Sequence, residues 1–275
     1  MASTPQRRKK SPVRGKERLR AAFRDDRAAL IPYLTAGYPT LDGAREVGEA
    51  YVEAGADVVE IGIPFSDPLA DGPTIQDTTT RALRNGANLD YTLGLASEFS
   101  GRVPVVFLVY YNIIFARGVE GFLDEAAGAG VSGLVIPDLP VDEAGRLAEL
   151  SAGRGVAFCP LVAPTSTDER ISRAGELATG FLYCVSVAGV TGVRDELPRG
   201  AVELLRRARG VVEAPVVLGF GIGSVEAAAR AAGEADGITI GSKLMRLVGE
   251  GGPERAGGWL REVHDALSDV ARVGG

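Results

Sequence analysis

Glu60, Asp67 and Asp71 are the residues whose types and spacing could do acid–base chemistry in this chain. Glu60 interrupts an apolar run that is typical of a buried strand, and the two aspartates follow in a segment rich in proline and glycine. Burial disfavours the charged form of a carboxyl, so we expect Glu60 to hold or give a proton near neutral pH. The spacing also fits a structural glutamate followed by two surface acids.

Three glycine-rich turns late in the chain could bind an anion. They are Gly189-Val190-Thr191-Gly192, Gly219-Phe220-Gly221-Ile222-Gly223-Ser224 and Gly241-Ser242. Glycine lets backbone N–H groups approach an anion, and a helix that begins at Ser224 would add its positive end. A dinucleotide fingerprint is a competing interpretation of the second turn, but its glycine spacing is not G-x-G-x-x-G. The turns therefore favour phosphate, with plain tight turns as the alternative.

Lys243 is the only lysine after Lys16, and it directly follows the third turn. A lysine at this place could form a Schiff base with a carbonyl substrate. Its position in a first helical turn instead favours pairing with phosphate or solvent.

Composition excludes several classes of site. With His264 as the only histidine, neither a histidine-based zinc site nor a Ser-His-Asp triad can be built, and no metal site is predicted. Cys159 and Cys184 lack metal-like spacing, which indicates reduced thiols and a cytoplasmic location. The net charge of -6 argues against general nucleic-acid binding. The longest apolar run, residues 103–115, is too short to span a bilayer.

The elements that must position these residues alternate between strand and helix. Strands are predicted at 30–35, 57–62, 103–109, 133–137, 156–162, 181–185, 216–218 and 237–240. Helices are predicted at 17–27, 41–54, 74–84, 91–100, 118–129, 142–151, 167–177, 200–208, 224–232 and 254–271. This even alternation favours an α/β fold, a closed (β/α)8 TIM barrel over residues 17–275, rather than an open doubly wound sheet. Residues 1–16, basic and without an apolar stretch, are predicted to be a disordered tail.

In such a barrel the chemistry lies at the carboxyl ends of the strands. That rule brings Glu60 and Asp71 to one mouth, together with Tyr33, Leu108 and Tyr183. The three glycine-rich turns face the same mouth, two of them after the seventh and eighth strands, where barrels commonly bind phosphate.

The motifs together resemble those of the tryptophan synthase alpha subunit family. The similar stretches are residues 32–39, residues 60–76 and the three glycine-rich turns, and the resemblance runs from about Leu19 to the C-terminus. Segment 64–73 is highly specific to that family, whereas other phosphate-binding barrels share the late glycine turns.

The resemblance implies a lyase that cleaves indole-3-glycerol phosphate to indole and glyceraldehyde 3-phosphate. Glu60 matches the catalytic glutamate, a shuttle that protonates the ring carbon and takes the proton of the hydroxyl that becomes the aldehyde. Asp71 matches the carboxylate that holds the indole N–H and stabilises positive charge on the ring. Tyr183 matches a tyrosine near the leaving side chain. The substrate-binding residues implied in the same way are Tyr33, Ile75 and Leu108 around the indole and Gly192, Phe220, Gly221, Gly241 and Ser242 around the phosphate, with Thr191 beside them.

The resemblance also implies a partner. A pyridoxal-phosphate beta subunit would form an alpha2beta2 heterotetramer with this chain, receive indole through a tunnel and join it to serine. Asp67 and Pro68 would contact that subunit, segment 186–199 would be a lid, and no cofactor is expected in this chain. Val187 stands where many members carry arginine, Lys243 where a small residue is common, and Tyr33 where phenylalanine is frequent.

Other functions fit parts of the same sequence. Another phosphate-binding barrel lyase or isomerase would keep the late glycine turns but would not need Asp71 for an indole nitrogen. A subunit kept only to activate a beta partner would be expected to lose Glu60 or Asp71, and both are present. A stand-alone indole producer would keep both.

Overall fold

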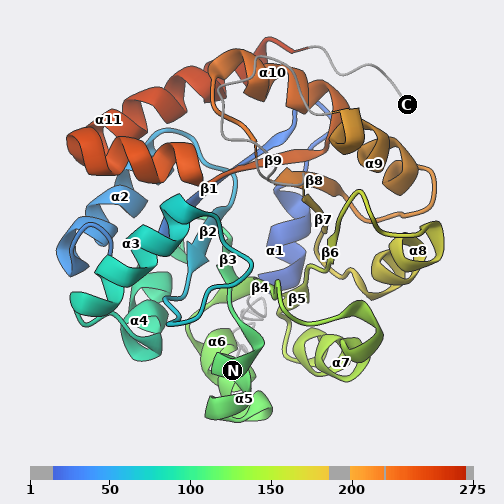
Figure 1. Cartoon of the computed structure of the whole chain (residues 1–275), viewed down its shortest axis with the longest axis horizontal. Helices are drawn as coiled ribbons and strands as arrows, with labels where there is room; N and C mark the ends of the chain where they lie inside the picture. Colours follow the sequence, from blue (N-terminus) through green and yellow to red (C-terminus); the bar gives the residue numbers. More distant parts are fainter. Residues whose placement is uncertain (1–14, 186–198, 220, 271–275) are drawn as a thin grey trace, which may run out of the picture.

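The computed structural model describes residues 15–185, 199–219 and 221–270. In it, parallel strands form a ring that helices surround (Figure 1). The strands are β1 (Ala29–Thr35), β2 (Val59–Gly62), β3 (Val105–Leu108), β4 (Val131–Val135), β5 (Ala157–Phe158), β6 (Leu161–Val162), β7 (Leu182–Val185), β8 (Val216–Gly219) and β9 (Gly237–Ile240). Nearly all of their residues are buried, because the strands are covered both inside and outside the ring.

The strand pairing confirms the predicted TIM barrel, with one difference at the fifth strand. The order is β5-β4-β3-β2-β1-β9-β8-β7-β6, with parallel neighbours throughout. The predicted strand 156–162 is two short strands, because Pro160 has no N–H and interrupts the ladder. The ring still closes there: the N–H of Cys159 donates to Leu134 O at 2.9 Å, and the N–H of Tyr183 donates to Pro160 O at 2.9 Å.

The helices lie around the outside of the ring, except α1, which precedes the first strand. They are α1 (Gly15–Ala21), α2 (Leu41–Glu53), α3 (Pro73–Arg84), α4 (Leu89–Phe99), α5 (Tyr111–Arg117), α6 (Val119–Gly128), the 3-10 turn η1 (Val141–Glu143), α7 (Gly145–Gly153), α8 (Asp168–Leu177), α9 (Arg199–Arg209), α10 (Val225–Glu234) and α11 (Ser242–Ser268). The predicted start of α8 is confirmed, since Thr167 Oγ1 accepts from the N–H of Arg170 at 3.3 Å. Within the described ranges, no helix is long and apolar enough to cross a membrane.

Two helical segments are absent from the sequence prediction. One is α5, hidden in the apolar run 103–115, where periodicity alone does not separate a strand from a helix. The other is most of the first half of α11: the sequence indicates a first helical turn at Lys243, but the predicted closing helix begins only at residue 254. The backbone is non-helical at Gly251 and Gly252, and Pro253 follows, so the apparent helix start is a kink within a longer element.

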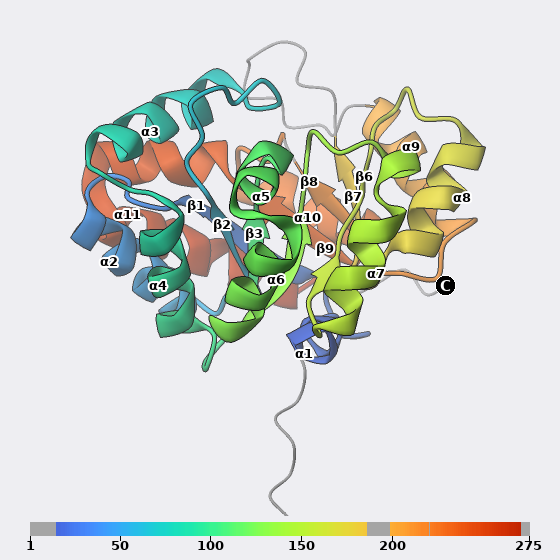
Figure 2. The same cartoon turned by 90° about the horizontal axis from the view of Figure 1, so that it is seen from below.

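Helix α1 covers the amino-terminal end of the barrel, and Figure 2 places the segment between β2 and α3 at the opposite end. Leu19 is fully buried against Gly133 and Gly180, where an added Cβ would lie 2.9 and 3.0 Å from its Cδ2. The predicted helix 17–27 is wrong in its bounds, because α1 ends at Ala21; Arg27, beyond that end, forms a bidentate ion pair with Asp57 at 2.6 and 2.8 Å. Gly15 and Lys16 belong to α1, and the remaining tail, residues 1–14, lies outside the described residues. The domain boundary stays a prediction.

Candidate active site

Glu60 is a buried carboxyl in β2. Its side chain is 1% exposed, and Oε1 has no hydrogen-bond partner within the described part of the chain. Burial, with a smaller contribution from the nearby charge of Asp71, raises the pKa of Glu60 to about 8. The carboxyl therefore holds a proton at neutral pH, as the sequence predicts, and Oε1 is buried with no protein partner among the described residues.

Asp71 lies in the loop between β2 and α3, close enough to Glu60 for their charges to interact. Burial raises the pKa of Asp71 to about 6, and a hydrogen bond from the Tyr110 hydroxyl opposes that rise. The same hydroxyl accepts from the N–H of Ala70 at 3.1 Å, while Gln76 Nε2 donates to Asp71 O at 2.9 Å. Tyr110 follows β3 and holds the loop by both contacts. No sequence pattern reveals this role of Tyr110.

Tyr33 and Tyr183 bring two aromatic rings to the same region. Tyr33 is the register partner of Glu60 on β1, and the charge of Glu60, after burial, raises the pKa of Tyr183 well above its ordinary value. Each ring passes over a strand-end glycine. A Cβ at Gly62 would lie 2.1 Å from the Tyr33 hydroxyl, and one at Gly219 would lie 2.0 Å from Tyr183 Cε1. Both glycines are thus needed for the rings to fit, a requirement that no sequence pattern reveals.

Ile75 and Leu108 lie on α3 and β3, elements that contact β1 and β2 respectively. Ile75 is in the first turn of α3 and is 5% exposed, while Leu108 ends β3 at 8% exposed. Leu108 is the register partner of Gly62, the glycine under the Tyr33 hydroxyl. The three residues predicted to surround an indole therefore come from neighbouring elements at one mouth.

The predicted phosphate residues are described only in part. Gly241 precedes α11 and Ser242 is its first residue. Gly221 has φ 87°, a left-handed conformation that suits glycine, and Ser224 Oγ caps α10 by accepting from the N–H of Ala227 at 3.2 Å. Phe220, Thr191, Gly192 and the rest of segment 186–198 lie outside the described residues.

Lys243, in the first turn of α11, faces a ring in the second half of the same helix. Its Nζ lies 5.6 Å from the centre of the Trp259 ring, a cation–π contact between the two halves of α11. The two roles weighed for Lys243 from the sequence stay predictions.

Comparison with known proteins gives one consistent family. The family model described as the tryptophan synthase alpha chain matches residues 19–267. The chain belongs to the tryptophan synthase alpha chain family. The alpha chain of Synechococcus elongatus is 43% identical over 251 residues, which cover 90% of this chain and 94% of that protein.

Solved structures of tryptophan synthase share the fold. A Mycobacterium tuberculosis tryptophan synthase chain is 37% identical with a TM-score of 0.84, covering 94% of this chain and 97% of that one. A mutant alpha subunit from Pyrococcus furiosus is 38% identical with a TM-score of 0.80, covering 89% of this chain and 99% of that one.

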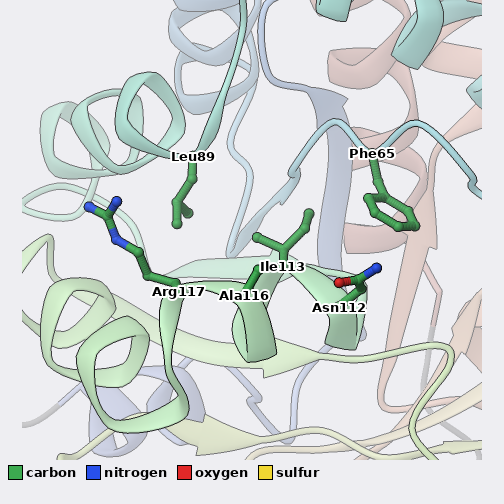
Figure 3. A pocket seen from close by; sticks show the side chains of 6 residues that line it. All are labelled: Phe65, Leu89, Asn112, Ile113, Ala116 and Arg117. Carbon is green, nitrogen blue, oxygen red and sulfur yellow. The ribbon is translucent and has the colours of Figure 1, made fainter.

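Beside the mouth of this alpha chain lies a cavity of about 370 Å³, shown in Figure 3. It is lined by Phe65, Leu89, Asn112, Ile113, Ala116 and Arg117. Phe65 belongs to the loop that carries Asp71 and stacks on Tyr110, with ring centres 5.1 Å apart. The cavity therefore adjoins the predicted site through Tyr110 but is lined by none of its catalytic residues.

Two large apolar side chains are exposed on the segments that line this cavity. Leu69, in the β2–α3 loop, is 92% exposed, and Phe115, in α5, is 70% exposed. Asp67 and Pro68, the predicted partner contacts, precede Leu69, and Asp67 is also exposed. This part of the alpha chain thus combines a hollow with apolar side chains in solvent, which is typical of a protein–protein contact.

Proposed function

We propose that Glu60 is the proton shuttle of the alpha reaction, the cleavage of indole-3-glycerol phosphate to indole and glyceraldehyde 3-phosphate. That reaction is the activity of the family to which this chain belongs. The observation that carries the proposal is a buried, protonated carboxyl with an unpartnered oxygen. Glu60 would give its proton to the ring carbon that bears the side chain. The resulting carboxylate would take the proton of the hydroxyl that becomes the aldehyde as the carbon–carbon bond breaks.

Asp71 would act as the anionic partner of that shuttle. With a pKa of about 6, Asp71 is ionised at neutral pH while Glu60 is not. Its carboxylate can accept the indole N–H and stabilise the positive charge that ring protonation creates. The Tyr110 hydroxyl, bonded both to Asp71 and to the backbone of Ala70, would keep the carboxylate in place.

The other predicted residues would bind the two ends of the substrate. Tyr33, Ile75 and Leu108 are apolar or aromatic, nearly buried and carried by neighbouring elements, so they would enclose the indole. Tyr183 would line the side-chain position near Glu60. At the phosphate end, Gly221, Gly241 and Ser242 would bind through backbone N–H groups and the start of α11, together with Thr191, Gly192 and Phe220.

The partner of an alpha chain in this family is the tryptophan synthase beta subunit, and indole passes to it for synthesis of L-tryptophan. The two subunits form an alpha2beta2 heterotetramer in which pyridoxal phosphate belongs to the beta subunit, and the alpha chain has no cofactor. We propose that Leu69 and Phe115 make the contact together with Asp67 and Pro68, which the resemblance implies, since exposed apolar side chains are stabilised by leaving water. A cytoplasmic location accords with two buried cysteines that are not disulfide-bonded.

The proposal is tested by measuring indole release from indole-3-glycerol phosphate for the wild type and for Glu60→Gln. Each purified protein is assayed alone and with a matching beta subunit. We expect slow release alone, faster release with the partner, and none from Glu60→Gln under either condition. Rapid release without the partner would indicate a free-standing indole producer. Wild-type rates from Glu60→Gln would eliminate the proton shuttle, and no release from the wild type would favour another phosphate-binding barrel activity.

A further inference from the structure

Three buried hydroxyl groups form a continuous chain beside the mouth of the barrel. Tyr33 Oη lies 3.2 Å from Thr35 Oγ1, and Thr35 Oγ1 lies 2.8 Å from Thr78 Oγ1. Thr78 Oγ1 in turn lies 2.9 Å from the carbonyl oxygen of Ile75. The side chains of Tyr33, Thr35 and Thr78 are all at most 5% exposed, so the chain is shielded from water. It links β1 to the first turn of α3.

The direction of every hydrogen bond in this chain is fixed by counting protons. The Ile75 carbonyl can only accept, so the single hydroxyl proton of Thr78 is donated to it. Thr78 must then accept from Thr35, which leaves Thr35 to accept from Tyr33. The chain therefore runs one way, from Tyr33 to Ile75, and aligned hydroxyls of this kind strengthen one another in a buried setting.

The two ends of the chain are the residues proposed to enclose the indole from opposite elements. Tyr33 has little freedom to slide, because its hydroxyl lies over Gly62, where an added Cβ would be only 2.1 Å away. Ile75 has its carbonyl bound at the other end of the chain. We propose that Thr35 and Thr78 are positioning residues that fix the separation of Tyr33 and Ile75 and thereby the fit of the substrate's aromatic ring. This inference rests on the proposed function.

A merely structural role makes a different prediction. Loss of a structural hydrogen bond lowers stability without changing how the folded protein binds substrate. Loss of a contact that sets the width of a binding site weakens ground state and transition state alike, which raises KM and leaves kcat. Binding geometry is sensitive to displacements of about 0.5 Å, so the loss of one hydrogen bond in this series is sufficient to change the affinity for the aromatic ring.

The test compares Thr78→Val, Thr78→Ser, Tyr33→Phe and the double variant Tyr33→Phe/Thr78→Val in the full chain. Steady-state cleavage of indole-3-glycerol phosphate gives KM and kcat, calorimetric titration with indole gives ring affinity, and thermal melting reports stability. We expect Thr78→Val and Tyr33→Phe each to raise KM and weaken indole binding by roughly three- to tenfold, with kcat near that of the wild type. Thr78→Ser, which keeps the hydroxyl, restores both values.

The double variant should be no worse than the stronger single variant, because both changes break the same chain. A lower melting temperature with wild-type KM and indole affinity would overturn the inference, as would multiplied effects in the double variant. If Thr78→Val does not fold, Tyr33→Phe decides the matter alone, since it keeps the ring and removes only the first hydroxyl. If the wild type releases no indole, the proposed function is wrong. If the wild type is active and the variants have its KM and indole affinity, only this inference is wrong.

Discussion

Glu60 and Asp71 share one barrel mouth and titrate on opposite sides of neutral pH, because burial raises their pKa values to about 8 and about 6. Between those values Glu60 holds its proton and Asp71 is ionised, the state that the proposed reaction needs. We expect kcat/KM for indole release to be bell-shaped, with its maximum between the two values. In Asp71→Asn the acidic limb should disappear and the rate should fall about a hundredfold or more. A pH–rate profile of both proteins checks this, and activity that rises steadily below about pH 5 would contradict it.

Glu60 should also make the protein less stable as pH rises. The unfolded chain ionises this carboxyl near its ordinary pKa of 4.5, the folded chain only near 8, so the unfolded state binds fewer protons between those values. The free energy of unfolding therefore falls as pH rises from about 4.5 to about 8, and Asp71 acts in the same direction over a lower range. Glu60→Gln removes the first contribution. As pH rises across this range, the melting temperature of Glu60→Gln should increase relative to that of the wild type. Parallel plots of melting temperature against pH would contradict the burial of Glu60.

Tyr110→Phe should move the pH profile without removing a reacting group. The Tyr110 hydroxyl lowers the pKa of Asp71, so its loss lets that pKa rise and shifts the acidic limb towards neutral pH. It also frees the backbone at Ala70, so we expect kcat/KM at neutral pH to fall about tenfold. Tyr111→Phe is the matched control, since the packing of that ring on Phe115 is kept. An acidic limb that stays in place in Tyr110→Phe would show that Asp71 is held by other contacts.

Glu60 illustrates what could be predicted from the sequence: a carboxylate inside an apolar strand indicates both its burial and its raised pKa. The Pro- and Gly-rich segment after it indicates the ordered loop that carries Asp71. The contact between this loop and Tyr110 could not be predicted, because the two segments lie about 40 residues apart and meet only when β2 and β3 pair. The same holds for Gly219. The ring of Tyr183, on the adjacent strand, occupies the space that a side chain at position 219 would need.

Gly219→Ala tests whether the Tyr183 ring requires a glycine at position 219. The new Cβ would lie 2.0 Å from Tyr183 Cε1, so the ring or the strand must move. We expect a loss of about 1–3 kcal/mol in the free energy of unfolding, as for other overpacked cores, and a fall in kcat/KM because Tyr183 leaves its place. Gly121→Ala is the control: it lies in α6, where no described atom comes within 4 Å of the added Cβ. That variant should be as stable as the wild type or up to about 1 kcal/mol more stable. Equal urea denaturation curves for Gly219→Ala and Gly121→Ala would contradict the packing argument.

Leu69→Asp should weaken association with the beta subunit. Leu69 is 92% exposed in the isolated chain, so the aspartate costs nothing in the fold, but at a contact it would bury a charge where an apolar side chain had been. We expect the affinity for a matching beta subunit, measured by calorimetry or sedimentation, to fall about tenfold or more, with the melting temperature of the isolated chain unchanged. Val211→Asp is the control, because Val211 is 50% exposed but lies between α9 and β8, at the opposite end of the barrel from the β2–α3 loop. If Val211→Asp weakened association and Leu69→Asp did not, the contact would have to be assigned to the amino-terminal end of the barrel.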